Sequence, residues 1–277
     1  IDHQRHPTTA PIPMKLIASD LDGTLLNAGS IVSERTRAAL RSAHDAGVMV
    51  AAATGRSHRT AQDVLAPTEV IRWAICSNGA TLYDLENRQI VSQTFVAAAA
   101  AENLLAVAEA LPDIGFAWET PDGLFRDHAM KIQMHRRYGP GVWDLEDEPP
   151  IAQVVDRLVK VMVGHPDLGH DALLTRLQSL GLGHLEISSS GADFVEITAP
   201  EAEKGQAVER LASQLGIDRV DTVAFGDQMN DLGMLRWVRS GYAMENAHPE
   251  ILAATDLRAP HHDDDGVAQV IEDLLNS

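Results

Sequence analysis

The sequence predicts an α/β protein in which a Rossmann-like, doubly wound parallel-sheet core carries an inserted α+β cap domain. Three features of the 277 residues indicate this class. Strand and helix patterns alternate in the N-terminal part of the chain, and the same alternation returns after residue 200. Between these parts the pattern changes to an alanine-rich helix and scattered strand candidates. Two separated halves of one sheet are typical of a core that is interrupted by an insertion.

The N-terminal half of the core begins with a strand, a helix and a second strand. Apolar runs at 15–19 and 48–53 have the length of buried strands, and 73–77 predicts a third. Between the first two runs, Ser33 can cap a helix whose small and apolar residues end against Gly47. Strand, helix and strand in this order form the unit of a parallel sheet.

The second half of the core follows the same pattern near the C-terminus. A helix is expected over 204–215, where Gly216 stops it, and strands are expected at 222–225 and 241–244. The sequence therefore assigns 14–82 and 191–277 to one catalytic core.

The segment between these halves, 83–190, is expected to form the cap and to choose the substrate. Its strand candidates are 158–164 and 185–188, and a helix is expected around 171–180. Residues 1–13 contain three prolines and no continuous apolar stretch, so we expect a disordered extension there.

Composition excludes several classes of function. The net charge of −18 would repel nucleic acid and anionic membrane surfaces, so neither is an expected partner. No apolar run is long enough to cross a bilayer. Cys76 is the only cysteine, which excludes an internal disulfide and makes a cytoplasmic location the default expectation. The many carboxylates are suited to binding a hard divalent cation.

Acidic residues follow two of the predicted strands. Asp20 and Asp22 lie in Asp-Leu-Asp-Gly-Thr after the first, and Asp227 and Asp231 lie in Gly-Asp-Gln-Met-Asn-Asp after a later one. Aspartate is common in turns, so each residue alone has an ordinary explanation. Together, at the ends of parallel strands, the four carboxylates would repel one another unless a cation lay between them. Mg²⁺ is expected rather than Zn²⁺, because no His and Cys cluster has ligand spacing.

Two further segments have the residue types that bind phosphate. Thr54, Gly55 and Arg56 follow the second strand, where a hydroxyl group and free amides can hold phosphate oxygens. Lys204, at the start of a helix, can neutralise charge on a phosphoryl group. A simple turn and a solvated surface lysine are the alternatives when each segment is taken alone.

The order Asp-x-Asp-Gly-Thr, Thr-Gly-Arg, Lys and Gly-Asp-x-x-Asn-Asp resembles the haloacid dehalogenase superfamily. Within it, the chain is most similar to the Cof-type phosphatases, which have a class IIB cap between the second and third motifs. The resemblance covers about 14–277. It implies that Asp20 attacks phosphorus to form an aspartyl phosphate, and that Asp22 first acts as acid and then as base.

The resemblance also implies roles for the other residues. Thr54, Gly55, Lys204 and Asn230 would bind or orient the phosphoryl group. Mg²⁺ would be held by the Asp20 side chain, the Asp22 backbone carbonyl, Asp227 and Asp231. Possible edges of the site are Arg56, Asn78 and Asn246. Glu245 departs from the family pattern, because relatives often have glycine at that place.

The sequence thus predicts a Mg²⁺-dependent phosphatase that acts on a small phosphorylated metabolite, with a sugar phosphate as the first expectation. A sugar phosphomutase uses the same intermediate and stays open, as does a catalytically silent ligand-binding protein on the same fold. The chain is expected to be a monomer or a homodimer. The cap also contains a group of basic residues. A solvated helix face is a simpler interpretation of this group than a binding site for a second anion. Its members are Arg126, His128, Lys131, Arg136 and Arg137.

Overall fold

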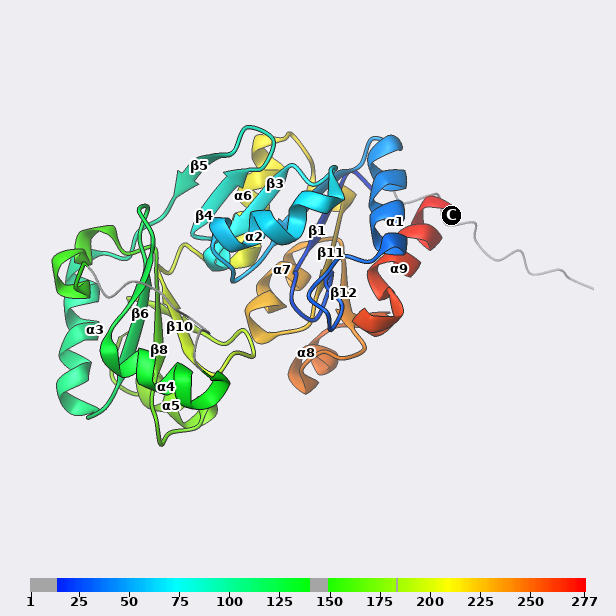
Figure 1. Cartoon of the computed structure of the whole chain (residues 1–277). Helices are drawn as coiled ribbons and strands as arrows, with labels where there is room; N and C mark the ends of the chain where they lie inside the picture. Colours follow the sequence, from blue (N-terminus) through cyan, green and yellow to red (C-terminus); the bar gives the residue numbers. More distant parts are fainter. Residues whose placement is uncertain (1–13, 140–148, 183) are drawn as a thin grey trace, which may run out of the picture.

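The computed structural model describes residues 14–139, 149–182 and 184–277, and this part of the chain forms two β-sheets (Figure 1). The expected disordered extension at 1–13 lies outside the described residues. In spatial order, the larger sheet contains β13 (Leu257–Ala259), β12 (Ser240–Met244), β11 (Thr222–Gly226), β1 (Leu16–Ser19), β2 (Met49–Ala53), β3 (Trp73–Cys76), β4 (Thr81–Asp84) and β5 (Gln89–Gln93).

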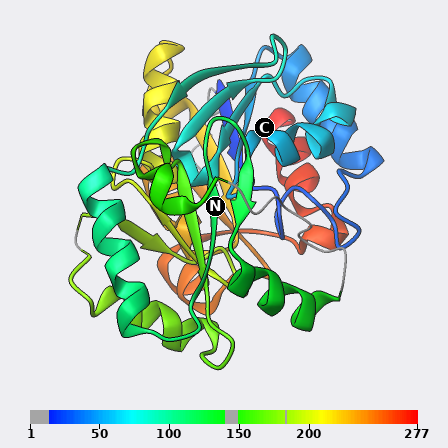
Figure 2. The same ribbon diagram turned by 60° about the vertical axis from the view of Figure 1, so that its left-hand side comes forward.

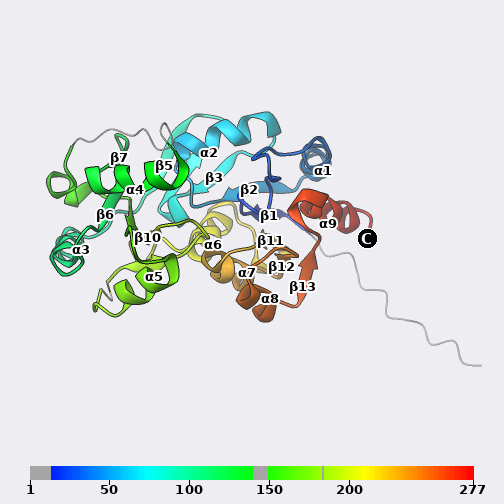
Figure 3. The ribbon, with the colours of Figure 1, turned by 60° about the horizontal axis from the view of Figure 1, so that its bottom comes forward.

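The larger sheet is parallel from β13 to β3 and becomes antiparallel at β4 and β5. Its central strand β1 is completely buried at Leu16, Ile17 and Ala18, as its apolar run predicts. Helices cover both faces, with α1, α2 and α9 on one side and α6, α7 and α8 on the other (Figure 3). Their bounds are α1 Glu34–Asp45, α2 His58–Leu65, α6 Lys204–Gln214, α7 Leu232–Trp237, α8 Pro249–Ala254 and α9 Gly266–Leu275. The predicted Rossmann-like, doubly wound α/β core is confirmed.

The predicted ends of two helices are confirmed as well. The side chain of Ser33 accepts a hydrogen bond from the backbone N–H of Thr36 at 3.0 Å, which caps α1. At the other end, Gly47 has φ +84°, a conformation that favours glycine. Gly216 follows α6 with φ +67° in the same way.

The smaller sheet and its helices form a lobe beside the core (Figure 2). In spatial order its antiparallel strands are β7 (Leu124–Arg126), β6 (Gly115–Glu119), β8 (Lys160–Gly164), β10 (Val195–Thr198) and β9 (Glu186–Ser188). The helices of this lobe are α3 (Ala98–Ala110), α4 (His128–Tyr138) and α5 (His170–Gln178). Short 3-10 turns of the whole chain lie at Ala66–Thr68, Ser77–Gly79, Ile151–Gln153, Val155–Arg157, Arg219–Asp221, Met229–Asp231 and His262–Asp264.

The two faces of the smaller sheet have different environments. One face packs in an apolar cluster that includes Phe116, Trp118 and Val161 together with Leu104 of α3 and Leu173 of α5. The other face packs on Met130 and Met134 of α4 over only part of its area. Its remaining part looks toward the core and borders the cavity described below.

The sheets divide the chain at later residues than the expected boundaries at 82/83 and 190/191. The β4–β5 hairpin, which ends at Gln93, pairs with the core, and β10 belongs to the smaller sheet. The hairpin was missed because β5 is an exposed edge strand with a largely polar sequence. The chain passes from the larger to the smaller sheet after β5. It returns to the core after β10, before α6 begins at Lys204. The wider assignment of the smaller lobe as a substrate-specificity cap stays a prediction.

No helix in the described part of the chain is long and apolar enough to span a membrane.

Helix α6 packs so closely on α7 that one of its glycines has no room for a side chain. A Cβ atom added at Gly205 would lie 2.6 Å from the backbone carbon of Gly233. We therefore expect Gly205→Ala to lower the free energy of unfolding by about 1–3 kcal/mol, although alanine is the better helix former. Urea unfolding monitored by circular dichroism measures this loss. Ser213→Ala, at an exposed position of the same helix, is the control that should lose nothing, and equal stability of the two variants would contradict the expectation.

Candidate active site

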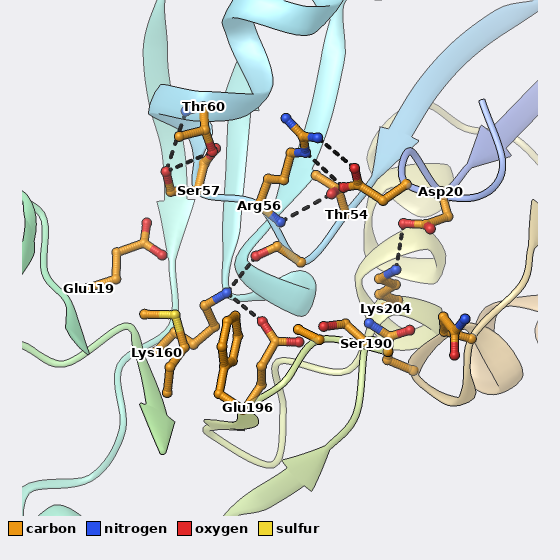
Figure 4. Close-up of a pocket in the computed structure, with 18 of the residues that line it drawn as sticks. Asp20, Thr54, Arg56, Ser57, Thr60, Glu119, Lys160, Ser190, Glu196 and Lys204 are labelled. Atoms are coloured by element: carbon orange, nitrogen blue, oxygen red, sulfur yellow. Dashed lines mark hydrogen bonds and ion pairs between the residues drawn. The ribbon is translucent and has the colours of Figure 1, made fainter. Parts of the chain in front are cut away.

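The predicted site residues meet at the carboxyl end of the parallel strands. Asp20 follows β1, Thr54 follows β2 and Asp227 follows β11, while Lys204 enters from the start of α6 (Figure 4). Asp20, Thr54 and Lys204 border a cavity of about 540 Å³ between the two sheets, and Asp227 lies behind Asp20. The lining of this cavity in the described chain is Asp20, Asp22, Thr54, Gly55, Arg56, Ser57, Thr60, Glu119, Leu124, Lys160, Met162, Ser190, Gly191, Ala192, Phe194, Glu196, Lys204, Gln228 and Asn230.

Three carboxylates form a buried cluster at the floor of this cavity. Ligand oxygens of Asp20, Asp227 and Asp231 all lie within 4.8 Å of one another. Burial, reinforced by the charge of Asp231, raises the pKa of Asp227 to about 6. The same two causes raise the pKa of Asp20 well above its usual range. The cluster therefore holds more negative charge than its surroundings stabilise.

Lys204 is the cation that compensates part of this charge. Its Nζ atom donates to Asp20 Oδ1 at 2.8 Å and to Asp231 Oδ1 at 2.6 Å, and its side chain is buried. Burial alone would lower the pKa of Lys204, but the two carboxylates outweigh burial and raise it. Lys204 is thus a permanently charged group beside Asp20, and the alternative of a solvated surface lysine is wrong.

Asp231 organises the loop that carries Asp227. Its second oxygen accepts hydrogen bonds from the backbone N–H groups of Asp227 and Gln228, at 3.0 and 2.9 Å. Both oxygens of Asp231 therefore already have protein partners. Asp227 is oriented by Thr24, whose hydroxyl group donates to Asp227 Oδ1 at 2.7 Å. Gly23 has φ +78° and lies against the Asp227 side chain. A side chain would not fit there, because a Cβ atom would lie 2.5 Å from Asp227 Oδ2.

Asp22 lies at the mouth of the cavity and outside the carboxylate cluster. Its side chain is 55% exposed, and both of its oxygens accept hydrogen bonds from Arg56, at 2.7 and 2.5 Å. This bidentate pair fixes the direction of the Asp22 carboxylate at the mouth of the cavity. The predicted edge residue Arg56 thus contacts a predicted catalytic residue.

The other predicted residues surround the loop that follows β2. Thr54 is buried, and its hydroxyl oxygen accepts from the backbone N–H of Arg56 at 3.1 Å. Asn78 has φ +58°, and its Oδ1 atom accepts from Asn230 Nδ2 at 3.1 Å, which joins two segments of the site. Asn246 lies outside the cavity lining, and its Nδ2 atom donates to the carbonyl oxygen of Gly23 at 2.7 Å. Asn246 therefore supports the loop after β1 from behind.

The sequence did not identify the residues of the smaller sheet that line the cavity. Glu119, Lys160 and Glu196 are buried there, whereas the basic group of the expected cap residues is absent from the lining. A charged residue inside an otherwise apolar strand, as in Lys-Val-Met-Val-Gly at 160–164, was the available signal. This signal is ambiguous by itself, because long-range pairing decides which charged strand residues are buried.

Comparisons with known proteins agree with this geometry. The family model of haloacid dehalogenase-like hydrolases matches residues 17–271. Phosphatase YwpJ of Bacillus subtilis is 30% identical over 95% of this chain and 100% of its own length. HMP-PP phosphatase of Cronobacter sakazakii is 30% identical over 86% of this chain and 87% of its own length.

A solved structure shows the same likeness. A haloacid dehalogenase-like hydrolase from B. subtilis, 26% identical, superposes with a TM-score of 0.77 over 94% of this chain and 99% of that one. The resemblance that the motifs indicated is therefore confirmed over nearly the whole chain. This chain belongs to the haloacid dehalogenase-like hydrolase family, among its Cof-type phosphatases.

Proposed function

We propose that the chain hydrolyses a small phosphorylated metabolite, of the sugar-phosphate class, with Asp20 as a covalent nucleophile and Mg²⁺ as cofactor. One observation carries this proposal. A buried carboxylate, Asp20, lies between a buried lysine and two further carboxylates at the end of a parallel sheet, and it faces a cavity. A candidate nucleophile, positive charge and room for a substrate occur together at this place.

The donor set fits Mg²⁺. The three clustered carboxylates supply hard oxygen ligands, and the raised pKa values of Asp20 and Asp227 reflect burial and repulsion that a divalent cation would relieve. Asp20, Asp227, Asp231 and the backbone carbonyl of Asp22 would hold the ion. Bound Mg²⁺ would supply positive charge for the phosphoryl oxygens. Asp20 and Asp227 are the principal side-chain ligands in this proposal, because Asp231 is committed to Lys204 and to two backbone N–H groups, whereas Asp227 is held by the side chains of Thr24 and Gln228.

The remaining chemistry belongs to protein side chains. A carboxylate oxygen of Asp20 attacks phosphorus, the bond from phosphorus to the leaving oxygen breaks, and Asp22 gives that oxygen a proton. Asp22 then takes a proton from a water molecule, whose oxygen attacks phosphorus and releases phosphate from Asp20. Thr54, the Gly55 amide and Lys204 bind the phosphoryl oxygens, and Asn230 helps to orient the group.

Phosphate release from p-nitrophenyl phosphate and a panel of sugar phosphates, with Mg²⁺ or with EDTA, tests the proposal. We expect phosphate release that depends on Mg²⁺ and does not need a second sugar as acceptor. Transfer of phosphate to a sugar hydroxyl would show a phosphomutase instead. Binding of the same compounds by folded, metal-loaded protein without turnover would show a silent ligand-binding protein.

Metal binding should also increase the thermal stability of the folded protein. We expect Mg²⁺ to raise the melting temperature at pH 7.5, because ligand at 100 times its Kd stabilises the folded state by about 2.7 kcal/mol. Protons compete for Asp227, so the apparent affinity should fall as the pH drops through about 6. Differential scanning fluorimetry at several Mg²⁺ concentrations measures both effects. Asp227→Asn should remove most of the shift, and an unchanged shift in this variant would place the ion elsewhere.

A further inference from the structure

The end of the cavity farthest from Asp20 is formed by charged residues of the smaller sheet. Glu119 of β6 pairs directly with Lys160 of β8, and Glu196 of β10 pairs with Met162 of β8. Residues paired across antiparallel strands share a face, and Lys160 and Met162 share one by alternation. All four side chains therefore point into the cavity. Figure 4 shows Glu119 and Lys160 on the opposite side of the site from Asp20.

Each of the two glutamates has one oxygen with a protein partner and one without. Glu119 Oε2 accepts from the Ser77 hydroxyl group at 2.6 Å, and Glu196 Oε1 accepts from Lys160 Nζ at 2.7 Å. By hydrogen-bond geometry, Glu119 Oε1 and Glu196 Oε2 have no partner among the described residues, although the two residues are only 0% and 2% exposed. Ser190 and Asn78 lie close enough to Glu196 to act with Lys160 against burial and lower its pKa. A buried acceptor without a partner lowers stability, because it loses its hydrogen bonds to water and gains none in the protein. Two such acceptors in one cavity indicate that a ligand supplies the donors.

Among the described residues, no cation that lines the cavity is free to bind a second anionic group. The cations that line the cavity in the described chain are Arg56, Lys160 and Lys204, and each is already paired with a carboxylate. Lys160 also donates to the carbonyl oxygen of Gly55 at 2.6 Å. With Glu119 and Glu196 so close, a second phosphate or carboxylate would meet negative charge without compensation.

The other neighbours at this end are apolar. Leu124, Met162 and Phe194 line the same cavity beside the two glutamates. They offer a surface for a carbon skeleton, while the carboxylates offer acceptors. The cavity of about 540 Å³ is large enough for a leaving group of sugar size.

Building on the proposed phosphatase function, we propose that Glu119 and Glu196 bind the leaving group of the substrate through its hydroxyl or amino groups. The selected substrates are then monophosphates whose leaving group is neutral and rich in hydrogen-bond donors. Compounds with a second anionic group are rejected. A hydroxyl group is the most suitable partner, since it can pair with Glu119 in either protonation state.

Steady-state kinetics of phosphate release tests this with three kinds of probe. The hydroxylated probes are sugar and sugar-alcohol monophosphates of three to six carbons, the anionic probe is fructose 1,6-bisphosphate, and p-nitrophenyl phosphate lacks hydroxyl donors. Wild type should show its highest kcat/KM with a hydroxylated monophosphate. A higher value for the bisphosphate or for p-nitrophenyl phosphate would overturn the proposal.

Two isosteric variants test the residues themselves. In Glu119→Gln and Glu196→Gln, kcat/KM for the best hydroxylated substrate should fall at least about tenfold more than kcat/KM for p-nitrophenyl phosphate. Equal losses on both substrates in both variants would overturn the proposal. Glu102→Gln, an exposed change on α3, is the matched control and should alter neither value.

The measurements distinguish a failure of this proposal from a failure of the proposed phosphatase function. Failure of wild type to release phosphate from every probe would refute the phosphatase proposal itself. Release from p-nitrophenyl phosphate with no preference for hydroxylated substrates would refute only the role of the glutamates. If either variant does not fold, as judged by circular dichroism, the wild-type substrate order and the other variant still decide.

Discussion

Asp20→Asn is expected to abolish phosphate release while leaving the metal-free protein at least as stable as wild type. The amide cannot act as the nucleophile, so kcat should fall by a factor on the order of 10⁴ or more. Stability should not fall, because the ionised Asp20 carboxylate is buried beside Asp231 and Asp227. Its pKa is higher in the folded than in the unfolded chain, so ionisation at neutral pH costs stability in wild type. Lys204 keeps Asp231 as its partner in the variant.

The measurement is urea unfolding without Mg²⁺ at pH 7.5 and near pH 4, together with a phosphate-release assay. The gain in stability should be present at pH 7.5 and smaller near pH 4, where Asp20 of wild type is protonated in the folded state and partly protonated in the unfolded state. Asp256→Asn, an exposed change of the same kind, should alter neither stability nor rate. A variant that keeps appreciable turnover would exclude Asp20 as the nucleophile.

Lys204→Met is expected to be the most destabilising single change at the site, and it should also be inactive. Removing the ammonium group leaves the Asp20 and Asp231 carboxylates buried without their cation. Loss of one partner from a buried ion pair costs roughly 3–5 kcal/mol. The loss should be largest above pH 7 and should shrink as the pH falls, because protonation removes the unpaired charges. Mg²⁺ should restore part of the stability by supplying positive charge.

Urea unfolding at several pH values measures this loss, and Lys15→Met is its control. Lys15 also pairs with a carboxylate, Asp221, at 2.6 Å, but its side chain is 57% exposed. Water screens that pair, so its removal should have a far smaller effect. A loss in Lys204→Met no larger than that of the control would mean that the buried cluster does not depend on the lysine.

Local patterns were sufficient to predict the core. The apolar run of β1 and the capping of α1 by Ser33 depend on neighbours in sequence, so both were predicted and confirmed. Parallel strands end at one edge of a sheet, so the residues after them were expected to meet there. Asp20 and Thr54 line the same cavity, and Asp227 clusters with Asp20. Their chemical roles stay predictions until they are measured.

The far side of the cavity depended on contacts that no local pattern contains. Glu119 lies 41 residues before Lys160 and becomes its neighbour only through strand pairing. A glutamate in a strand usually faces solvent, so nothing in the sequence alone marked it as buried. The exchange of β4, β5 and β10 between the expected domains has the same origin, because strand membership is a long-range property.

The two chain crossings have a consequence for the inheritance and engineering of these proteins. The nucleophile and the other residues of the proposed chemistry all belong to the core, so the lobe between β5 and α6 can be exchanged as a cassette. The cassette is not wholly independent, because Lys160 Nζ donates to the Gly55 carbonyl oxygen and Glu119 accepts from Ser77. A chimera that receives another lobe has to supply equivalent partners at these two positions and at Pro121, whose carbonyl oxygen accepts from Arg59 Nη2 of α2 at 2.6 Å. We therefore expect the sequence of such lobes to be constrained where they contact the core and free to vary elsewhere.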